Sequence, residues 1–316
     1  MRRNDRKLDL AARAGWLYYV ANNTQDEIAA KLNVSRQAAQ RLVALASSEK
    51  LIRHRLDHPL VKCIELAETL RARHGLTSCE VAPSDPEPKD SLANLGEWAA
   101  TCLEGYLISK APTVVALSAG RALRAMVNHV SPMNQPQHKI VSLQGHMAPD
   151  GRASHYEVVM NLADRINAQA YLLPTPVVAR SAAERAILQQ QLSFLAVQEL
   201  VKQAKVAFVG IGEVTWNGPL QVDGFYGDAE VAELLELGAV GAILGWAYDR
   251  DGRLVPGSIN LRVAGMSLDQ VPAGRTIGVA CGPGKVEAIC AALRGRLVSG
   301  LITDETTARL VVDQSA

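Results

Sequence analysis

In two short stretches of the sequence, a cationic side chain lies next to glycine, whose lack of a side chain lets a ligand approach the backbone. Arg121 follows Gly120 in LSAGRAL (residues 117–123), and Lys285 closes the glycine-rich run CGPGK (281–285). Each stretch lies between a β-branched run and a helix-like run, so each is expected to be a strand-to-helix turn. Free backbone N–H groups gather at the start of a helix, where anions bind. Such turns could serve catalysis, nucleotide binding or the sensing of a small molecule.

Two further turns extend the same pattern. Gln144, Gly145 and His146 follow the strand expected at 139–143, and the run VGIG ends the strand expected at 206–210. In open α/β sheets, ligands bind outside the carboxyl ends of the strands. One glycine-rich turn is weak evidence, because many turns contain glycine for steric reasons alone. Four convergent turns that carry Arg, Gln, His and Lys predict a polar pocket.

The sequence lacks the common motifs of catalysis and nucleotide binding. It has no P-loop and no G-x-G-x-x-G after a strand, and it has no G-x-S-x-G or H-E-x-x-H motif. The nearest acids, Asp223, Asp228 and Asp249, show no paired acid–base spacing, and the seven histidines show no metal-ligand spacing. We therefore expect no catalytic residue, no metal and no cofactor.

Cysteine usage and hydropathy indicate a cytoplasmic protein. The five cysteines are an odd number without a C-x-x-C pair, which fits buried thiols in a reducing compartment. The N-terminus carries acids and lacks the apolar core of a signal peptide. The apolar runs fall short of the roughly 20 residues that span a bilayer. We expect no membrane partner.

Strands and helices alternate from about residue 91 onwards. The expected strands are 113–117, 139–143, 170–173, 206–210, 276–280 and 296–302. The expected helices are 92–109, 120–129, 154–168, 181–202, 228–237 and 284–294. This alternation predicts an α/β domain with a mostly parallel sheet, which would position the turns described above at its strand ends.

Charge is unevenly distributed along the chain. Residues 1–56 contain eleven Lys and Arg against five acids, a net charge of +6, whereas the remainder carries −5. A small basic region joined to a larger, mildly acidic one indicates a nucleic-acid-binding domain attached to a domain with another task.

The basic region has the pattern of three helices. The run LDLAARAGWLYYVA (8–21) has apolar residues at helical spacing. Thr24 then opens TQDE, a capping box with Glu27. Asn33 tolerates the positive φ of a tight turn, and Ser35 is the expected N-cap of a third helix, RQAAQRLVALA. This order of caps and turn predicts a helix-turn-helix motif.

Polar side chains around the third helix suit DNA recognition, because Arg binds guanine, Gln binds adenine and both bind phosphates. We expect DNA contacts from Thr24, Gln25, Ser35, Arg36, Gln37, Gln40 and Arg41. Arg53, His54 and Arg55 follow in a stretch that has the composition of a wing, and they could contact phosphates. The alternative is a three-helix bundle with an ordinary solvated charged face.

A third region joins the basic and acidic ones. A helix-like run begins after Pro59 and ends at Gly75, and the run APSDPEPKD (82–90) has the composition of an exposed loop. The helix could pair with its counterpart in a dimer or pack on the larger domain. The expected parts are a helix-turn-helix domain at 1–57, a linker helix and loop at 58–90, and an effector-binding domain at 91–316.

Eight segments together resemble the SorC family of sugar-binding transcriptional regulators, and the resemblance covers nearly the whole chain. The segments are NTQDEIAAKLNVSRQAAQRLV, VALSAGRAL, IVSLQGH, YLLPTPV, VGIGEV, GAVGAILGWAYDRDGRLV, IGVACGPGKVEAICAALRG and LITDETTARLVV. The last four, in this order near the C-terminus, are the specific ones.

The resemblance implies a winged helix-turn-helix domain joined to an effector domain similar to glucosamine-6-phosphate deaminase and ribose-5-phosphate isomerase folds. It implies control of a carbohydrate or polyol operon through operator DNA, by a homo-oligomer that is a dimer or a tetramer. The matching segments place effector contacts at Ser118, Gly120, Arg121, Gln144, Gly145, His146, Ser154, His155, Gly282 and Lys285.

Two residues depart from the pattern of many relatives. Ala122 stands where many have Thr, whose hydroxyl suits phosphate, and Ala242 stands where many have an acid, which suits sugar hydroxyls. Both agree better with the sorbitol, sorbose and polyol branch, and the expected effector is a sugar, a polyol or a sugar phosphate. The alternative is a sugar-phosphate isomerase or deaminase with an appended DNA-binding domain, which would need a general base near the pocket.

Overall fold

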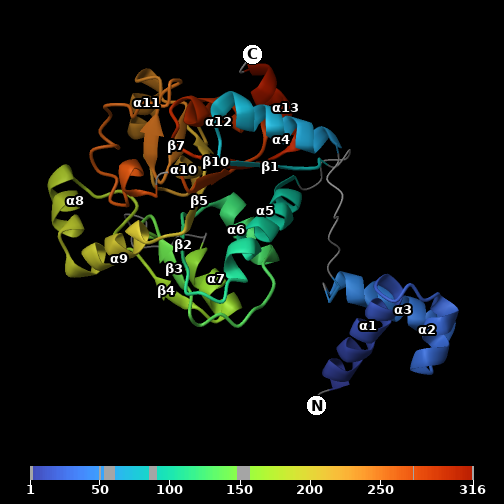
Figure 1. The fold of residues 1–316 in the computed structure, drawn as a ribbon. Helices are drawn as coiled ribbons and strands as arrows, with labels where there is room; N and C mark the ends of the chain where they lie inside the picture. Colours follow the sequence, from blue (N-terminus) through green and yellow to red (C-terminus); the bar gives the residue numbers. More distant parts are fainter. Residues whose placement is uncertain are drawn as a thin grey trace. The chain divides into compact units, whose positions relative to one another are not determined.

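The chain forms two compact units, Met1–Pro59 and Leu60–Ala316. Figure 1 shows both, coloured along the sequence from blue to red. The computed structural model describes residues 3–49, 51–52, 61–84, 91–147, 157–272 and 274–314.

The described part of the smaller unit contains three helices. They are α1 (Arg3–Tyr19), α2 (Gln25–Leu32) and α3 (Arg36–Ser48). Their buried core consists of Ala14, Ile28, Ala39 and Val43. The expected wing residues Arg53, His54 and Arg55 lie outside the described residues.

Side-chain caps begin α2 and α3, as the sequence predicts. Thr24 Oγ1 accepts a hydrogen bond from the N–H of Glu27 at 3.3 Å, and Glu27 Oε2 accepts one from the N–H of Thr24 at 2.7 Å. Asn33 ends α2 with a φ of 52°. Ser35 Oγ then accepts from the N–H of Ala38 at 3.2 Å. These local contacts set the turn between α2 and α3.

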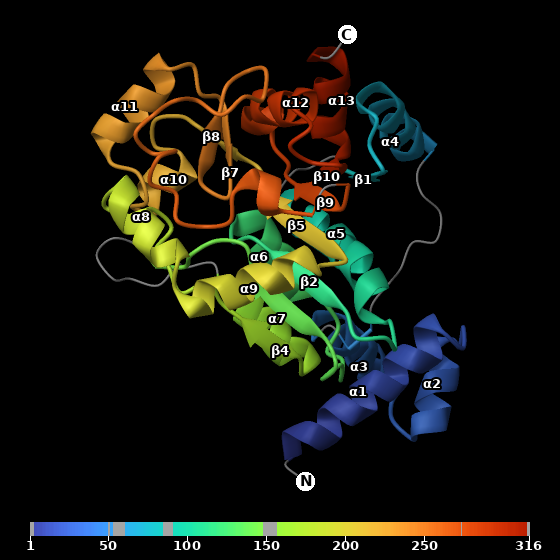
Figure 2. The same cartoon turned by 60° about the vertical axis from the view of Figure 1, so that its left-hand side comes forward.

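A seven-stranded parallel sheet forms the centre of the larger unit, as Figure 2 shows. In spatial order its strands are β1 (Ser78–Ala82), β10 (Gly300–Asp304), β9 (Thr276–Val279), β5 (Val206–Gly210), β2 (Val114–Leu117), β3 (Lys139–Ser142) and β4 (Gln169–Tyr171). From β2 the chain adds β3 and β4 on one side and then returns to add β5 on the other. The boundary between β2 and β5 is therefore a topological switch point, where such sheets bind ligands.

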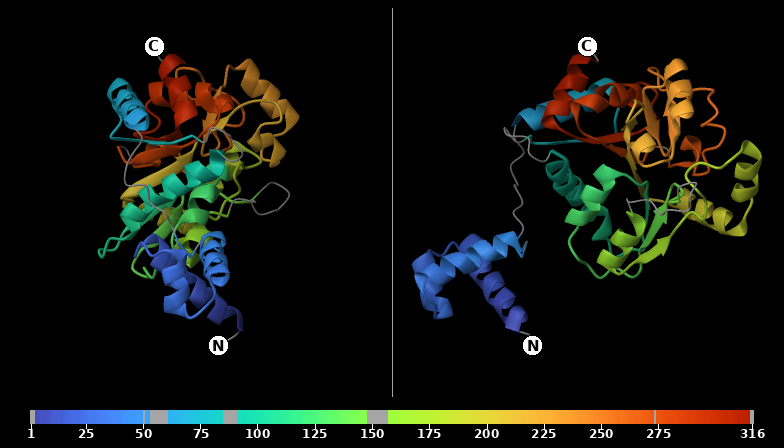
Figure 3. Two further views of the ribbon diagram at one scale, coloured as in Figure 1. Left: turned by 90° about the vertical axis from the view of Figure 1, so that its right-hand side faces the viewer. Right: turned by 180° about the vertical axis from the view of Figure 1, so that it is seen from behind.

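Helices cover both faces of this sheet, because successive side chains along a strand point to opposite faces. Val115 and Leu117 of β2 lie in one hydrophobic core, and Ala116 lies in the other. The first core includes residues of α5 (Ser91–Leu107), α6 (Arg121–His129) and α7 (Val159–Ile166). The second includes residues of α4 (Val61–His74), α9 (Leu192–Lys202), α12 (Val286–Arg294) and α13 (Glu305–Gln314). The two views in Figure 3 show these helices on either side of the strands.

A second, antiparallel sheet consists of β6 (Gly212–Glu213), β7 (Gly241–Ile243) and β8 (Trp246–Tyr248). The remaining described elements are α8 (Ala182–Gln189), α10 (Pro219–Val222), α11 (Asp228–Glu236) and the 3-10 turns η1 (Leu268–Gln270) and η2 (Pro283–Lys285). This small sheet is not predicted from the sequence, because strands of two or three residues are too short to show an alternating pattern.

The predicted α/β fold is confirmed, with three differences in its elements besides the small sheet. The strand expected at 296–302 is β10, which begins only at Gly300, because Arg296 adopts a φ of 53° in the turn after α12. The helix expected at 181–202 is two helices, since the chain is extended at Gln191. Strand β1 was not predicted at all.

The region expected to be a linker helix and loop at 58–90 belongs largely to the larger unit. Strand β1 pairs with β10 in parallel, from Ser78 opposite Gly300 onwards. Helix α4 buries Cys63 and Leu70 in the core of that unit. The larger unit thus begins before the boundary expected at residue 91, because it includes an edge strand and a packed helix that precede that residue.

The described residues also bear on membrane spans and on the cysteines. Among its helices, none is long and apolar enough to cross a membrane. The five cysteines all lie among the described residues, and none of them forms a disulfide. Burial raises the pKa of Cys79 and of Cys102 to about 12, so both are neutral at physiological pH.

Candidate functional site

A cavity lies in the larger unit at the carboxyl ends of β2, β5 and β9. Its lining includes Ser118 and Gly120 after β2, Gly210 and Gly212 at the end of β5, and Val279 at the end of β9. The cavity therefore occupies the topological switch point between β2 and β5. Parallel strand order alone makes this the expected ligand-binding edge of the sheet.

The turn after β2 presents backbone N–H groups to the cavity. Gly120 has a φ of 136° and a ψ of 167°, a conformation that is essentially restricted to glycine. It is the N-cap of α6 and has no side chain to cap it, so the first N–H groups of that helix can serve a ligand. The buried hydroxyl of Ser118 accepts from the N–H of Gly210 at 3.0 Å, which joins the ends of β2 and β5.

Lys285 brings an ammonium group into the lining. Its Nζ donates to the carbonyl oxygen of Ile211 at 2.8 Å and lies 3.7 Å from Glu213 Oε2. The side chains of Lys285 and Glu213 are only 20% and 22% exposed. Burial lowers the pKa of Lys285; the carboxylate of Glu213 opposes this shift, and the charge of Arg121 adds to it. An ammonium group has three donors, which leaves capacity for an anionic or hydroxyl ligand.

Apolar side chains supply much of the remaining lining. Leu220 and Phe225 come from the segment around α10, and Ala242 and Leu244 come from the small sheet and the residue after it. Among the described lining residues the one acid is Asp223, at the C-terminal end of α10. Apolar walls with a few placed polar groups are typical of small-molecule sites.

The structure brings half of the predicted effector residues together. Those that line the cavity are Ser118, Gly120, Arg121, Gln144 and Lys285. Gly145, His146 and Gly282 are not among the described lining residues. Ser154 and His155 lie outside the part of the chain that the structure describes.

The three predicted residues that do not line the cavity have local environments of their own. A Cβ at Gly145 would come within 2.2 Å of the carbonyl oxygen of Thr175, so close backbone packing requires glycine there. Gly282 has a φ of 112°, and its N–H donates to Thr307 Oγ1 at 2.8 Å. His146 is partly buried, and its Nδ1 is without a hydrogen-bond partner in the described structure.

The cavity wall formed by residues 219–225 is not predicted from the sequence. It includes Pro219, Leu220, Asp223 and Phe225. The glycine and proline of Gly218–Pro219 mark a turn after β5, which was the available signal. That signal did not show that the segment returns to the cavity, because the return depends on the small sheet.

The cavity shows no metal-binding arrangement. In the described ranges, no group of three or more His, Cys, Asp or Glu residues could hold a metal ion. What the geometry offers is recognition of a small polar molecule by N–H groups, a guanidinium, an ammonium and one carboxylate.

The residues predicted to contact DNA lie on α2 and α3 of the smaller unit. Arg36, Gln37, Gln40 and Arg41 are exposed on α3. Arg36 Nε lies 3.5 Å from Asp26 Oδ1 with both side chains 69% exposed, so solvent screens this pair strongly. Thr24 and Ser35 act as helix caps, and Gln25 is partly buried at the start of α2. The exposed amide and guanidinium groups of α3 match the donors that proteins use in the major groove.

Comparison with known sequences gives full-length relatives. Residues 58–313 match the family model described as "Putative sugar-binding domain". The chain is 31% identical over 305 residues to the erythritol catabolism regulatory protein EryD of Brucella abortus, with 96% of each chain covered. It is 28% identical to the deoxyribonucleoside regulator of Bacillus subtilis, with 97% of this chain and 98% of the relative covered.

Comparison with solved structures gives the same architecture. The full-length sorbitol operon regulator SorC of Klebsiella pneumoniae superposes with a TM-score of 0.76 at 25% identity, covering 96% of this chain and 98% of SorC. A domain described as that of "a possible sugar-binding transcriptional regulator" from Arthrobacter aurescens has a TM-score of 0.71 at 21% identity; the match covers 81% of this chain and 99% of that domain. The second likeness, at less than 25% identity, shows the fold alone.

Proposed function

Because the chain belongs to the SorC family of sugar-binding transcriptional regulators, we propose that its cavity binds a small effector that controls operator binding by the smaller unit. The observation that carries this proposal is the position of the cavity. It lies at the switch point of the sheet, where Gly120, Arg121 and Lys285 converge from two different turns. The named relatives are regulators, which favours sensing over the isomerase or deaminase alternative.

We propose a polyol or its phosphate as the effector, acting on the operon of its own catabolism. EryD is named for erythritol catabolism and SorC for the sorbitol operon. The cations Arg121 and Lys285 and the N-terminus of α6 suit an anionic or hydroxyl group. The apolar Ala122 and Ala242 in the lining provide no further hydrogen-bond partner through their side chains. Erythritol and erythritol 4-phosphate are therefore the first probes.

The proposed DNA contacts are made by Arg36, Gln37, Gln40 and Arg41, with Thr24, Gln25 and Ser35 at the helix starts. Their support is the exposed face of α3 and the positive charge of the smaller unit. Family membership supports a homo-oligomer, a dimer or a tetramer, in which paired helix-turn-helix units bind two half-sites.

Calorimetric titration of the full chain with erythritol, erythritol 4-phosphate and inorganic phosphate tests the effector proposal. A probe that enters the cavity should bind the wild type and should bind Lys285→Ala more weakly. A ligand that binds only the folded chain should also raise its melting temperature. Equal binding to wild type and Lys285→Ala would place the ligand outside this cavity.

Fluorescence anisotropy on DNA from upstream of the chain's own gene tests the regulator proposal. Phosphate contacts release counterions, so the affinity should fall steeply as salt rises. Saturation with the effector should change that affinity. Salt-independent binding, or binding that no effector alters, would contradict the proposal.

A further inference from the structure

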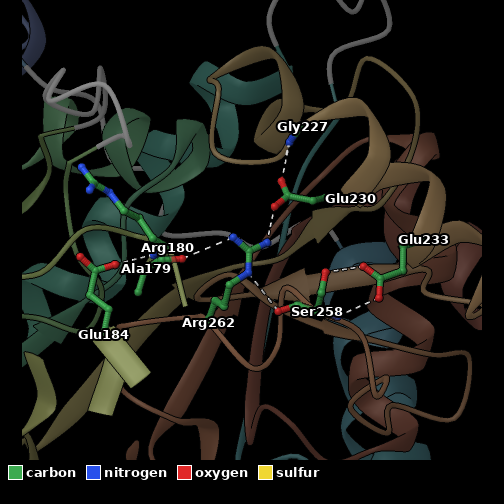
Figure 4. Close-up of polar contacts among 8 residues, drawn as sticks. All are labelled: Ala179, Arg180, Glu184, Gly227, Glu230, Glu233, Ser258 and Arg262. Carbon is green, nitrogen blue, oxygen red and sulfur yellow. Dashed lines mark hydrogen bonds and ion pairs between the residues drawn. The ribbon is translucent and has the colours of Figure 1, made fainter. Parts of the chain in front are cut away.

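Arg262 joins three segments of the larger unit, as Figure 4 shows. Its Nη2 forms an ion pair with Glu230 on α11. Its Nη1 donates to the carbonyl oxygen of Ala179 at 3.4 Å, and its Nε donates to that of Ser258 at 3.3 Å. The side chains of Arg262 and Glu230 are 21% and 25% exposed, so the pair is screened less than a surface pair.

The Glu230 end of this contact lies beside one wall of the cavity. Glu230 Oε2 accepts from the N–H of Gly227 at 2.6 Å, which fixes the start of α11. The cavity-lining residues 219–225 come immediately before that start. Between them, the hydroxyl of Tyr226 donates to the carbonyl of Gly245 at 2.7 Å, and Gly245 also lines the cavity. The position of α11 therefore sets the position of the 219–225 wall.

The Ala179 end lies beside a second wall. The N–H of Ala179 donates to the carbonyl of Arg262 at 2.8 Å, so the two residues contact each other through both backbone and side chain. Two residues earlier, the carbonyl of Val177 accepts from the N–H of Ala264 at 3.1 Å. Val177 lines the cavity. Arg262 thus connects two cavity walls that are about 40 residues apart in the sequence.

A second contact holds α11 to the same turn. The two carboxylate oxygens of Glu233 accept from the N–H of Ser258, at 2.9 Å, and from its hydroxyl. These hydrogen bonds lower the pKa of Glu233, so it stays ionised across the physiological range. Glu230 and Glu233 lie three residues apart on one face of α11, and both face the turn at 258–262.

Helix α8 is attached to this turn by polar contacts. It begins three residues after the contact at Ala179 and has no buried residue among those described. The guanidinium of Arg185 lies 5.0 Å from the ring centroid of Trp246, and its Nη1 donates to the carbonyl of Leu261 at 3.5 Å. Gln189 Nε2 donates to the carbonyl of Gly265 at 3.4 Å. Because α8 buries no residue among those described, its position depends on contacts with the 258–265 turn, on residues 179–181 and on the adjoining α9.

We propose that Arg262 is a positioning residue that couples the 219–225 wall of the cavity to helix α8. This inference rests on the proposed effector function of the cavity. When an effector contacts the 219–225 wall, the motion of α11 is reduced. Because Arg262 contacts Glu230 on α11 and also Ala179, the motion of Ala179 and of the start of α8 is reduced as well. The planar guanidinium suits this role, because its donors point to three acceptors at once.

Replacing Arg262 by lysine tests the contact with Glu230 apart from the contacts with the two carbonyl oxygens. Arg262→Lys keeps a cation beside Glu230, but a single ammonium cannot also hold the carbonyls of Ala179 and Ser258 in the planar geometry of arginine. Arg262→Ala removes both ends. The matched control is Arg250→Ala, which breaks the exposed ion pair with Glu287 on the same unit.

Hydrogen exchange of the full chain, read in α8 and in residues 219–226, is the measurement. Without ligand, Arg262→Ala should speed exchange in both segments by about tenfold, and Arg262→Lys should do so in α8 alone. Erythritol 4-phosphate should slow exchange of both segments in the wild type. In Arg262→Lys it should still bind within about threefold and slow the wall, but no longer slow α8.

The outcomes separate this inference from the proposed function. If α8 in Arg262→Lys behaves as in the wild type, the coupling is wrong. Faster exchange in α5 to the same extent would show general destabilisation and would also overturn it. If neither erythritol nor its phosphate binds the wild type, the effector assignment fails, while the measurements without ligand still decide the coupling.

Discussion

Helix α3 and the cavity both present cations, but Lys285 of the cavity is largely buried whereas Arg36 and Arg41 of α3 are exposed. Arg36 and Arg41 are exposed on α3, a helix whose start is set by the side-chain cap of Ser35. Lys285 of the cavity is largely buried, next to the carboxylate of Glu213 and the carbonyl of Ile211. An exposed guanidinium is screened by salt, whereas a buried ammonium keeps a stronger interaction with any ligand that reaches it.

This difference separates the two tasks of the molecule. Exposed cations suit a long, highly charged partner that many weak phosphate contacts hold. A buried cation suits a small partner that few contacts must hold. Substitutions in one unit should therefore leave binding by the other unit unchanged when each ligand is measured alone.

The largest effect is expected from Lys285→Ala. Losing a hydrogen bond from a charged donor should cost about 2 kcal/mol, or roughly thirtyfold in the Kd of erythritol 4-phosphate. DNA affinity without effector should not change. Calorimetry and anisotropy check the two halves, with the exposed Lys205→Ala as the matched control. A parallel loss of DNA affinity would contradict the division between the units.

Arg36→Ala or Gln40→Ala should weaken operator binding by about tenfold, which corresponds to the lower part of the range for a specific base contact. Affinity for erythritol 4-phosphate should stay the same. The control is Arg13→Ala, which removes an exposed ion pair with Asp9 on α1. If Arg13→Ala weakens binding as much, α3 has no special role in recognition.

Thr24→Ala should destabilise the smaller unit by about 1 kcal/mol, because it removes the capping box of α2. Hydrogen exchange should speed up in α2 and α3 but not in the sheet of the larger unit. Ser48→Ala, at the exposed end of α3, is the control within the same unit. Faster exchange in the sheet would show that the two units share their stability.

The smallest effect is expected from pH. The lowered pKa of Lys285 means that its ammonium loses its proton below the ordinary 10.5, so the affinity for erythritol 4-phosphate should fall as the pH rises through that lowered pKa. Titration calorimetry at increasing pH should show a few-fold loss that Lys285→Ala does not show.

Particular residues show how far the sequence predicts the site. Gly120, Arg121 and Lys285 were found because a glycine and a cation at a strand end form a local pattern. Gly145 and His146 follow a strand in the same way, yet the backbone at Gly145 packs closely against Thr175 and Pro176, and neither Gly145 nor His146 is among the described lining residues. Phe225 was missed because it reaches the cavity only when α10 and the small sheet are in place.

The sequence by itself determined the helix-turn-helix and most strands of the parallel sheet. Its caps, turns and apolar periodicity act within about four residues, so they need no distant partner. Tertiary structure alone decided the place of β1 beside β10, the 219–225 wall and the three contacts of Arg262. Those features join residues far apart in the chain, and they form only once the order of strands brings distant segments together.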